Sequence, residues 1–233
     1  TVASYMIEGG SSRDFAKAKG WMYGRVADFA ALITLLVEAT SQYLIRQVEA
    51  GAEVLQLFDS WAGALSHSDM RHFSLAPLRQ IVANVHAAHP NVPIILFPRG
   101  VGAGYLDFAI EKYADPKAAE ALALDPGVPL EWARDRLQSL ACLQGNLDPQ
   151  LLVAGGRSMN AAVARILNRL TDGPFIFNLG DAFESRERDG VERQPLSLVA
   201  GPNRSAVRVR PTRRLHLVGV RAVPDFARQD QRE

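Results

Sequence analysis

The sequence predicts an α/β fold, and within that class the C-terminal part of a (β/α)8 TIM barrel that lacks its first strands. Short apolar runs of strand length alternate with longer segments of helical periodicity. The runs begin near residues 53, 93, 120, 140 and 174. The connections between them can hold one or two helices, as parallel crossovers require. Polar residues end several different strands, which favours a barrel over the competing architecture, a doubly wound open sheet.

The first strands of the barrel are expected to be missing from this sequence. Five strands are too few for a barrel of eight. Residues 1–10 look like the end of one more strand and the loop after it. The sequence also begins with Thr1 and not with a methionine, so we expect it to begin inside a longer protein.

Two helices are predicted before the first full strand. Ser11 and Asp14 have the spacing of a capping box, which predicts a helix from Ser11 to about Tyr23. A second helix is predicted over residues 26–50, because its apolar side chains recur with helical periodicity and Gly51 can end it.

The first full strand ends in polar residues. Val54–Phe58 is nearly continuous apolar sequence, as in a strand buried on both faces of a parallel sheet. Asp59 and Ser60 follow at its carboxyl end, where parallel α/β proteins bind their ligands. Asp and Ser are also ordinary N-cap residues, so a helix cap is the alternative explanation.

The remaining elements follow the same rules. Pro77 suits the first turn of a helix, and Pro90 lies just after a helical segment. The further strands are expected at 92–97, 121–124, 140–143 and 175–177, and the further helices at 66–89, 104–113, 129–137, 149–154 and 158–171. The strand at 140–143 is expected to exit into the polar loop Gln144–Asp148.

The composition is that of an ordinary soluble globular protein, with 48% apolar and 22% charged residues among 233. The net charge of +1 gives no general attraction to nucleic acid or membrane, and no apolar run approaches the roughly 20 residues that span a bilayer. Cys142 is the single cysteine, so no disulfide can form within the chain. This cysteine usage, without a signal peptide, predicts a reducing, cytoplasmic location.

Residues 181–233 differ in character from the rest and are expected to form an irregular tail. They hold 11 of the 22 arginines and no lysine, without sustained strand or helix periodicity. Eight acidic residues are interspersed, so a disordered tail is favoured over a basic arm that binds nucleic acid. We therefore expect a barrel portion over 1–180 and a divergent tail over 181–233, arising from a reading-frame change or a fusion.

Six stretches give this sequence a resemblance to a known family. They are ASYMIEGGSS (3–12), QVEAGAEVLQLFDSWAG (47–63), VPIILFPRG (92–100), VPLEWAR (128–134), LQGNLDP (143–149) and FIFNLG (175–180). In this order and at this spacing, they make the chain resemble uroporphyrinogen decarboxylase of haem and chlorophyll biosynthesis over residues 1–180. The resemblance implies a (β/α)8 barrel that often pairs as a homodimer.

The resemblance also implies a reaction. Family members are carboxy-lyases that remove carboxyl groups from the acetate arms of uroporphyrinogen, leaving methyl groups and forming coproporphyrinogen. They use no metal and no organic cofactor, because a protonated pyrrole ring is an electron sink for the leaving carboxylate. The protein has to supply a proton donor, an anchor for the pyrrole N–H groups, and cations or hydrogen-bond donors for the carboxylates.

The family's site residues carry over in part. Tyr5 matches its substrate-binding tyrosine, and Ser60 matches a serine that contacts a substrate carboxylate. Arg99, at the exit of strand 92–97, can reach an anionic substrate or pair with a neighbouring carboxylate. The family's arginine-rich segment and its pyrrole-gathering aspartate have no match here. Asp181 stands where the family has a histidine after N-L-G, and a carboxylate there would repel those of the substrate.

Plainer explanations compete with these assignments. Tyr5 can be a core aromatic with a satisfied hydroxyl. The glycines between residues 100 and 104 lack the spacing of a phosphate loop. Four histidines between residues 67 and 89 lack zinc-site spacing and a cysteine partner. This argues against the corrinoid-dependent methyltransferases, which share the barrel and use zinc held by His and Cys.

Two hypotheses about function follow from the sequence. The first is a truncated and impaired uroporphyrinogen decarboxylase with Tyr5, Ser60 and Arg99 as substrate-binding residues. The second is a non-catalytic barrel remnant that acts only through association.

Overall fold

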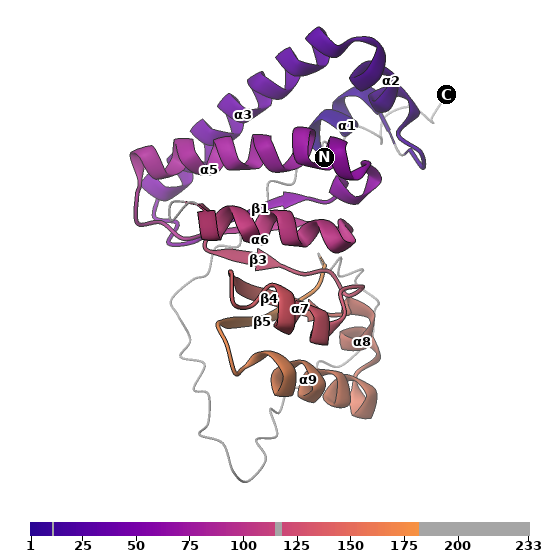
Figure 1. Cartoon of the computed structure of the whole chain (residues 1–233), viewed down its shortest axis with the longest axis vertical. Helices are drawn as coiled ribbons and strands as arrows, with labels where there is room; N and C mark the ends of the chain where they lie inside the picture. The colour runs from indigo at the N-terminus through magenta and orange to yellow at the C-terminus, as the bar shows by residue number, and fades with distance from the viewer. Residues whose placement is uncertain (11, 115–117, 182–233) are drawn as a thin grey trace, which may run out of the picture.

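The computed structural model describes residues 1–10, 12–114 and 118–181, which form one parallel sheet with helices packed against it (Figure 1). The strands are β1 (Leu55–Asp59), β2 (Ile94–Pro98), β3 (Ala121–Ala123), β4 (Cys142–Leu147) and β5 (Phe175–Leu179). The α-helices are α1 (Val2–Glu8), α2 (Ala16–Gly24), α3 (Val26–Glu49), α4 (His67–Met70), α5 (Ala76–Ala88), α6 (Tyr105–Ala114), α7 (Leu130–Arg136), α8 (Pro149–Ala154) and α9 (Gly156–Leu170). Shorter turns of helix are η1 (Ala62–Ala64), η2 (Arg71–Leu75) and η3 (Gly102–Gly104).

The strand order identifies the architecture. In a doubly wound sheet the order reverses at a switch point, whereas in a (β/α)8 barrel each strand lies beside the next one in the chain. Here the order is β1-β2-β3-β4-β5, and every neighbouring pair is parallel. One face of the strands forms a single hydrophobic core with α3, α5, α6, α7 and α9. The prediction of an α/β barrel arc is therefore confirmed, and the doubly wound alternative is excluded.

The opposite face of the sheet curls as the inside of a barrel does. Its small apolar cluster consists of Ile95, Phe97, Ala121 and Ala123. The side-chain amide of Gln144 on β4 donates a hydrogen bond to Oε1 of Gln56 on β1 at 3.2 Å. In a flat sheet, strands three places apart are separated by roughly 14 Å, and their side chains stand perpendicular to the sheet. This bond therefore requires strong curvature.

The barrel arc is open among the described residues. β1 pairs only with β2, and β5 pairs only with β4. Ile176 and Phe177 on β5 are 41% and 43% exposed, although both are large and apolar. An open edge and an uncovered apolar strand are what five strands of an eight-stranded barrel should show.

Residues 2–8 are predicted as the end of a strand and a loop, but they form helix α1. Ala3 and Ile7 lie four residues apart and pack in one cluster with side chains of α2 and α3. Gly9 then ends the helix in the left-handed conformation, with φ 71°. The prediction is wrong because so short an apolar run does not separate a strand from a helix by periodicity.

Two element boundaries also differ from the prediction. Helix α2 begins at Ala16 and not at Ser11, which lies outside the described residues. Just before it, Ser12 Oγ accepts a hydrogen bond from the Phe15 N–H at 3.0 Å, a turn that competes with an earlier helix start.

Strand β4 is longer than predicted and includes most of the expected polar exit. Its pairing with β5 continues as far as Leu147, opposite Leu179. Inside the strand, the Asn146 side-chain amide donates to the carbonyl groups of Asp125 and Val128 at 3.1 and 3.0 Å. The polar side chain is thus satisfied locally, and the backbone remains free to pair with β5.

Helix α3 corrects the expectation that no apolar segment is long enough to span a bilayer. By length and composition alone, this helix could cross a membrane, but the core helix of a soluble protein passes the same test. Here Leu44 is fully buried in the core, and Ser41 Oγ accepts a hydrogen bond from Asn84 of α5 at 3.0 Å. These contacts join the C-terminal half of α3 to α5 and the core, while only 22% of the apolar window of α3 is buried.

The other predicted strands and helices are present, with ends shifted by a few residues. The predicted tail, residues 181–233, lies outside the described residues except for Asp181. The expectation for that tail therefore stays a prediction.

Candidate functional site

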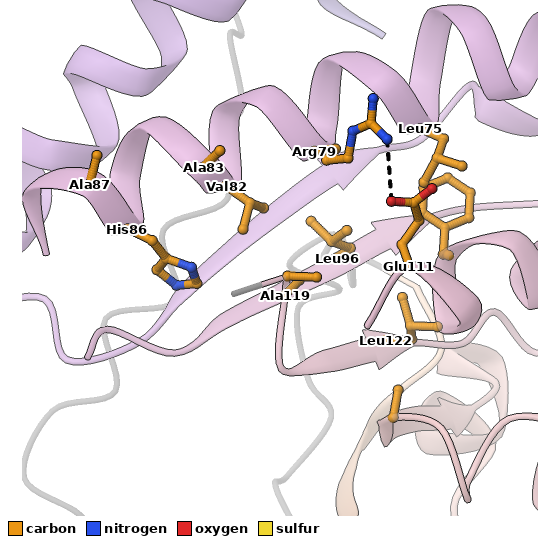
Figure 2. Close-up of a pocket in the computed structure, with 13 residues that line it drawn as sticks. Leu75, Arg79, Val82, Ala83, His86, Ala87, Leu96, Glu111, Ala119 and Leu122 are labelled. Atoms are coloured by element: carbon orange, nitrogen blue, oxygen red, sulfur yellow. Dashed lines mark hydrogen bonds and ion pairs between the residues drawn. The ribbon is translucent and has the colours of Figure 1, made fainter. Parts of the chain in front are cut away.

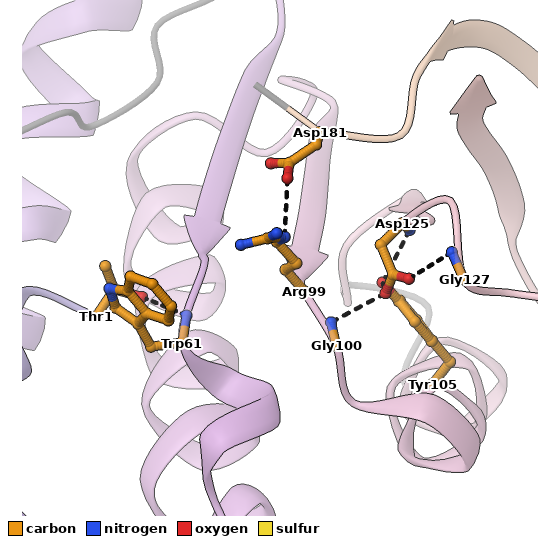
Figure 3. Close-up of polar contacts among 8 residues, drawn as sticks. All are labelled: Thr1, Trp61, Arg99, Gly100, Tyr105, Asp125, Gly127 and Asp181. Carbon is orange, nitrogen blue, oxygen red and sulfur yellow. Dashed lines mark hydrogen bonds and ion pairs between the residues drawn. The ribbon is translucent and has the colours of Figure 1, made fainter. Parts of the chain in front are cut away.

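Residues from distant parts of the chain meet at the carboxyl ends of the strands (Figure 3). This is the end at which parallel barrels build their sites. Arg99 follows β2, Asp125 follows β3, and Asp181 follows β5. Arg99 Nε and Asp181 Oδ2 form an ion pair at 2.9 Å, with 40% and 28% of the two side chains exposed. The curl of the sheet brings these residues together, because β2 and β5 are not neighbours.

The backbone around Arg99 is fixed from three sides. Its N–H donates to the carbonyl of Asp59 at 3.2 Å, and its own carbonyl accepts from the Gly63 N–H at 3.0 Å. The next N–H, that of Gly100, donates to Asp125 Oδ2 at 2.9 Å. The guanidinium therefore stands at the carboxyl ends of the strands on a backbone that has little freedom to move. We call this end of the sheet the rim.

Gly63 and Gly100 allow the loops after β1 and β2 to touch. A Cβ atom built at Gly63 would lie 2.4 Å from the Gly100 carbonyl oxygen, so no other residue fits without a shift of the backbone. Gly100 itself has φ +77°, in the left-handed region that glycine adopts without strain. The glycines of this loop thus serve close packing of backbone, which agrees with the missing phosphate-loop spacing.

Asp125 is held by a buried tyrosine. Tyr105 is fully buried, and its hydroxyl donates to Asp125 Oδ2 at 3.0 Å while accepting from the Asp125 N–H at 3.2 Å. Burial raises the pKa of Tyr105 well above its usual range, and the Asp125 carboxylate adds to this effect, so the phenol remains a donor. The other carboxylate oxygen accepts from the Gly127 N–H at 2.9 Å, which closes a tight turn.

Asp59, at the end of β1, is held by hydrogen bonds from two hydroxyl groups. Its Oδ1 accepts from the Thr1 hydroxyl at 2.6 Å, and its Oδ2 accepts from Ser74 Oγ at 2.6 Å. The alternative of a helix cap is wrong, because the helices that follow β1 in the described structure have Trp61 and Ser66 as their N-caps, and neither Asp59 nor Ser60.

Tyr5 lies beside Trp61, the residue that follows Ser60 after β1. Tyr5, on α1, is 47% exposed, which excludes a core role. Its ring meets that of Trp61 edge-on, with 6.5 Å between centroids, and Ser60 immediately precedes Trp61. The Trp61 indole N–H is buried and has no hydrogen-bond partner among the described residues. The substrate contacts expected of Tyr5 and Ser60 remain predictions.

A separate cavity of about 240 Å³ lies on the helix side of the sheet, between α5 and α6 (Figure 2). It is lined mostly by apolar side chains such as Val82 and Leu96, and an ion pair between Arg79 and Glu111 spans 3.4 Å beside it. Its lining includes Ala119 and Ala141, which precede β3 and β4, so it lies toward the amino ends of the strands, opposite the end where parallel barrels build their sites. We therefore place the candidate site at the rim and not in this cavity.

Within the described residues, no group of three His, Cys, Asp or Glu side chains could hold a metal ion. His67 is paired with Asp107 at 2.9 Å, and His86 is bonded to the carbonyl of Val92 at 3.0 Å. Cys142 begins β4 as predicted for a strand residue, and burial raises the pKa of its thiol.

The sequence did not reveal which residues pair with Arg99 or hold its backbone in place. The pairing of Arg99 with a carboxylate is confirmed, but its partner is Asp181, which the sequence analysis treats only as a source of repulsion. Tyr105 and Asp125 were not recognised as site-supporting residues. The Asp125-Pro126-Gly127 turn signal marks the position of Asp125, but nothing in the sequence pairs it with a buried phenol.

Comparison with known proteins gives one consistent result. A family model described as uroporphyrinogen decarboxylase (URO-D) matches residues 1–183. The uroporphyrinogen decarboxylase of Rhodospirillum rubrum is 49% identical over 180 residues, which cover 77% of this chain and 50% of that protein. The Paracoccus denitrificans protein of the same name is 46% identical over 180 residues, covering 77% and 51%. The chain thus spans about half the length of these relatives.

Proposed function

Because this chain belongs to the uroporphyrinogen decarboxylase family, we propose that it contributes to the decarboxylation of the acetate arms of uroporphyrinogen, giving coproporphyrinogen in porphyrin and haem biosynthesis. The family match over the whole described arc carries this proposal. Its chemistry is that of a carboxy-lyase, with a polycarboxylate tetrapyrrole as substrate and no metal or organic cofactor.

The rim suits an anionic substrate. A half-exposed guanidinium, Arg99, stands at the carboxyl ends of the strands on a fixed backbone. We assign it to one substrate carboxylate, since arginine binds carboxylates by charge-assisted hydrogen bonds. Ser60 and the exposed phenol of Tyr5 are assigned to further polar contacts on the same side, near the end of β1.

The described residues supply binding groups and not the whole reaction. In the proposed reaction, a pyrrole carbon takes up a proton, and the C–CO2 bond then breaks. Its electron pair flows into the protonated ring and CO2 leaves. A second proton then completes the methyl group, and loss of the first proton from the ring carbon restores the aromatic pyrrole. We assign no proton donor among Tyr5, Ser60 and Arg99, so the catalytic acid stays unassigned.

The proposal includes a cytoplasmic location and assembly as a homodimer. A single cysteine supports the first. The open edges of β1 and β5 support association in general, because unpaired strands expose backbone donors and acceptors. Neither a membrane nor nucleic acid is proposed as a partner.

A second candidate function is a barrel remnant that acts only through association. The ion pair between Arg99 and Asp181 favours it, because the cation proposed for the substrate already has a carboxylate partner.

Binding of uroporphyrin III, the oxidised form of the substrate, separates the two functions. We expect calorimetric titration to show saturable binding that Arg99→Ala weakens about tenfold, the loss of one charge-assisted hydrogen bond. Arg79→Ala is the matched control, because Arg79 is also half exposed and paired with a carboxylate but lies on α5, behind the sheet. Equal affinity of the two variants would show that Arg99 is not a substrate contact and would favour the remnant.

A further inference from the structure

The ring of Tyr5 has one specific side-chain contact. It meets the Trp61 ring edge-on, with 6.5 Å between centroids, although Tyr5 is 47% exposed. Among the described residues, the Tyr5 side chain makes no hydrogen bond and no other ring contact. The apolar contacts of α1 come from Ala3 and Ile7, which pack with side chains of α2 and α3. Tyr5 is two residues from each of them, so it lies on the other face of the helix and depends on Trp61 for its place.

Trp61 is itself fixed through both its backbone and its ring. Its N–H donates to Thr1 Oγ at 3.0 Å (Figure 3), and its carbonyl accepts from the Ala64 N–H at 3.0 Å. The Thr1 hydroxyl donates in turn to Asp59 Oδ1 at 2.6 Å. The Phe15 ring packs against the indole, with 5.1 Å between centroids. A side chain held in this way can serve as a platform for a more exposed neighbour.

Phe15 keeps its contact with Trp61 despite an unfavourable backbone conformation. Its φ of 54° lies in the left-handed region, which a bulky residue seldom adopts. Such a conformation persists only where the surrounding contacts outweigh it. Phe15 is the residue that precedes α2, and its ring is nearly buried. The Trp61 ring therefore joins the start of α2, as well as Tyr5 on α1, to the loop after β1.

From these contacts we propose that Trp61 is a positioning residue, whose ring holds the Tyr5 phenol where it can donate a hydrogen bond to a carboxylate of the bound anion. The inference rests on the proposed function for the substrate contact of Tyr5. We assign the effect to the ring and not to the indole N–H, because that N–H is buried and has no partner among the described residues.

Removal of the ring is expected to weaken the binding of uroporphyrin III. Without the platform, the Tyr5 side chain has to be ordered when the ligand binds, so Trp61→Leu should lower the affinity about fivefold in calorimetric titration. Trp61→Phe keeps a ring and loses only the N–H, so its affinity should stay within about twofold of the parent. Trp132→Leu is the matched control, because Trp132 is also partly buried but packs against the core from α7.

Urea unfolding of each variant separates a loss of positioning from a loss of folding. If Trp61→Leu does not fold, Trp61→Met takes its place, since the flexible methionine side chain fills irregular apolar space without a ring. A loss of affinity in Trp132→Leu as large as that in the Trp61 variant would mean that binding follows general stability, and the inference would be overturned.

A double variant tests whether Trp61 acts through the Tyr5 hydroxyl. In a Tyr5→Phe background, Trp61→Leu should weaken the binding of uroporphyrin III no further, because the group that the ring positions is already absent. A second loss of the same size would mean that Trp61 affects the ligand by another route, which contradicts the inference.

Motion of the Tyr5 ring gives a readout that needs no ligand. ¹³C relaxation of this ring should show a lower order parameter in ligand-free Trp61→Leu than in the parent chain, Trp61→Phe or Trp132→Leu. An unchanged order parameter would overturn the inference whatever the binding results. A lower order parameter, with an affinity for uroporphyrin III that neither Trp61→Leu nor Tyr5→Phe changes, would contradict the substrate contact in the proposed function and still support the positioning of the Tyr5 ring by Trp61.

Discussion

Together with the half of the Rhodospirillum rubrum enzyme that it does not match, this chain is expected to convert uroporphyrinogen to coproporphyrinogen, whereas alone it should give only background product. The proposed function assigns carboxylate contacts to Tyr5, Ser60 and Arg99, but it assigns neither the proton donor nor the pyrrole anchor that the reaction needs. Loss of one such stabilising group typically costs on the order of 10² in rate, so restoring both should raise the rate by at least that factor.

The structure gives physical grounds for assembly of the two pieces. β1 and β5 are unpaired on their outer edges among the described residues, so added parallel strands can complete their hydrogen bonding. Apolar side chains of α3, Val26 and Leu35, are 60% and 59% exposed and can be covered by a further piece of the protein.

Two controls accompany the measurement of coproporphyrinogen. Co-purification of the two pieces shows that they have assembled, and the same mixture with Arg99→Ala should form product more slowly. Assembly without product, even with Asp181→His in place of the parent residue, would contradict the proposed function while leaving the family membership intact.

The second large effect concerns stability. Leu143→Ala is expected to lower the free energy of unfolding by about 2–5 kcal/mol, because truncation of a fully buried leucine leaves a cavity. Leu143 is 0% exposed and lies on β4, where it is in register with Leu122 on β3 and Phe175 on β5. Truncation of Leu143 therefore removes packing contacts at a position where three neighbouring strands meet.

Urea unfolding followed by circular dichroism measures this change. Leu35→Ala is the matched control, since Leu35 is exposed on α3 and its loss should cost within about 0.5 kcal/mol. Equal costs for the two leucines would mean that the core described between the sheet and its helices is not formed in solution.

Much of the fold could be predicted because its signals are local. Strands buried on both faces read as short apolar runs, as in β1 and β2, and long amphipathic helices such as α3 keep their period over many residues. Glycine and proline marked where several helices begin or end. Helix α1 was missed because its seven residues are too few to show a period.

The candidate site could be predicted only as a set of strand ends. Arg99 was found because it follows an apolar run, but its pairing with Asp181 depends on the curl of the sheet, which no local pattern encodes. The bond from Tyr105 to Asp125 likewise joins a helix start to a later strand end. Interactions of this kind follow from the curl of the whole sheet and not from the segments that contribute to it.

The curl of the five strands into part of a barrel is the basis of this account, and coupling between Gln56 and Gln144 tests it most directly. A double-mutant cycle with Gln56→Ala and Gln144→Ala, measured by urea unfolding, should give a coupling energy of about 0.5–1.5 kcal/mol, as expected for one hydrogen bond between contacting side chains. In a flat sheet the two residues would be too far apart to interact. Additivity of the two substitutions, to within about 0.3 kcal/mol, would contradict the barrel arc and the rim site built on it.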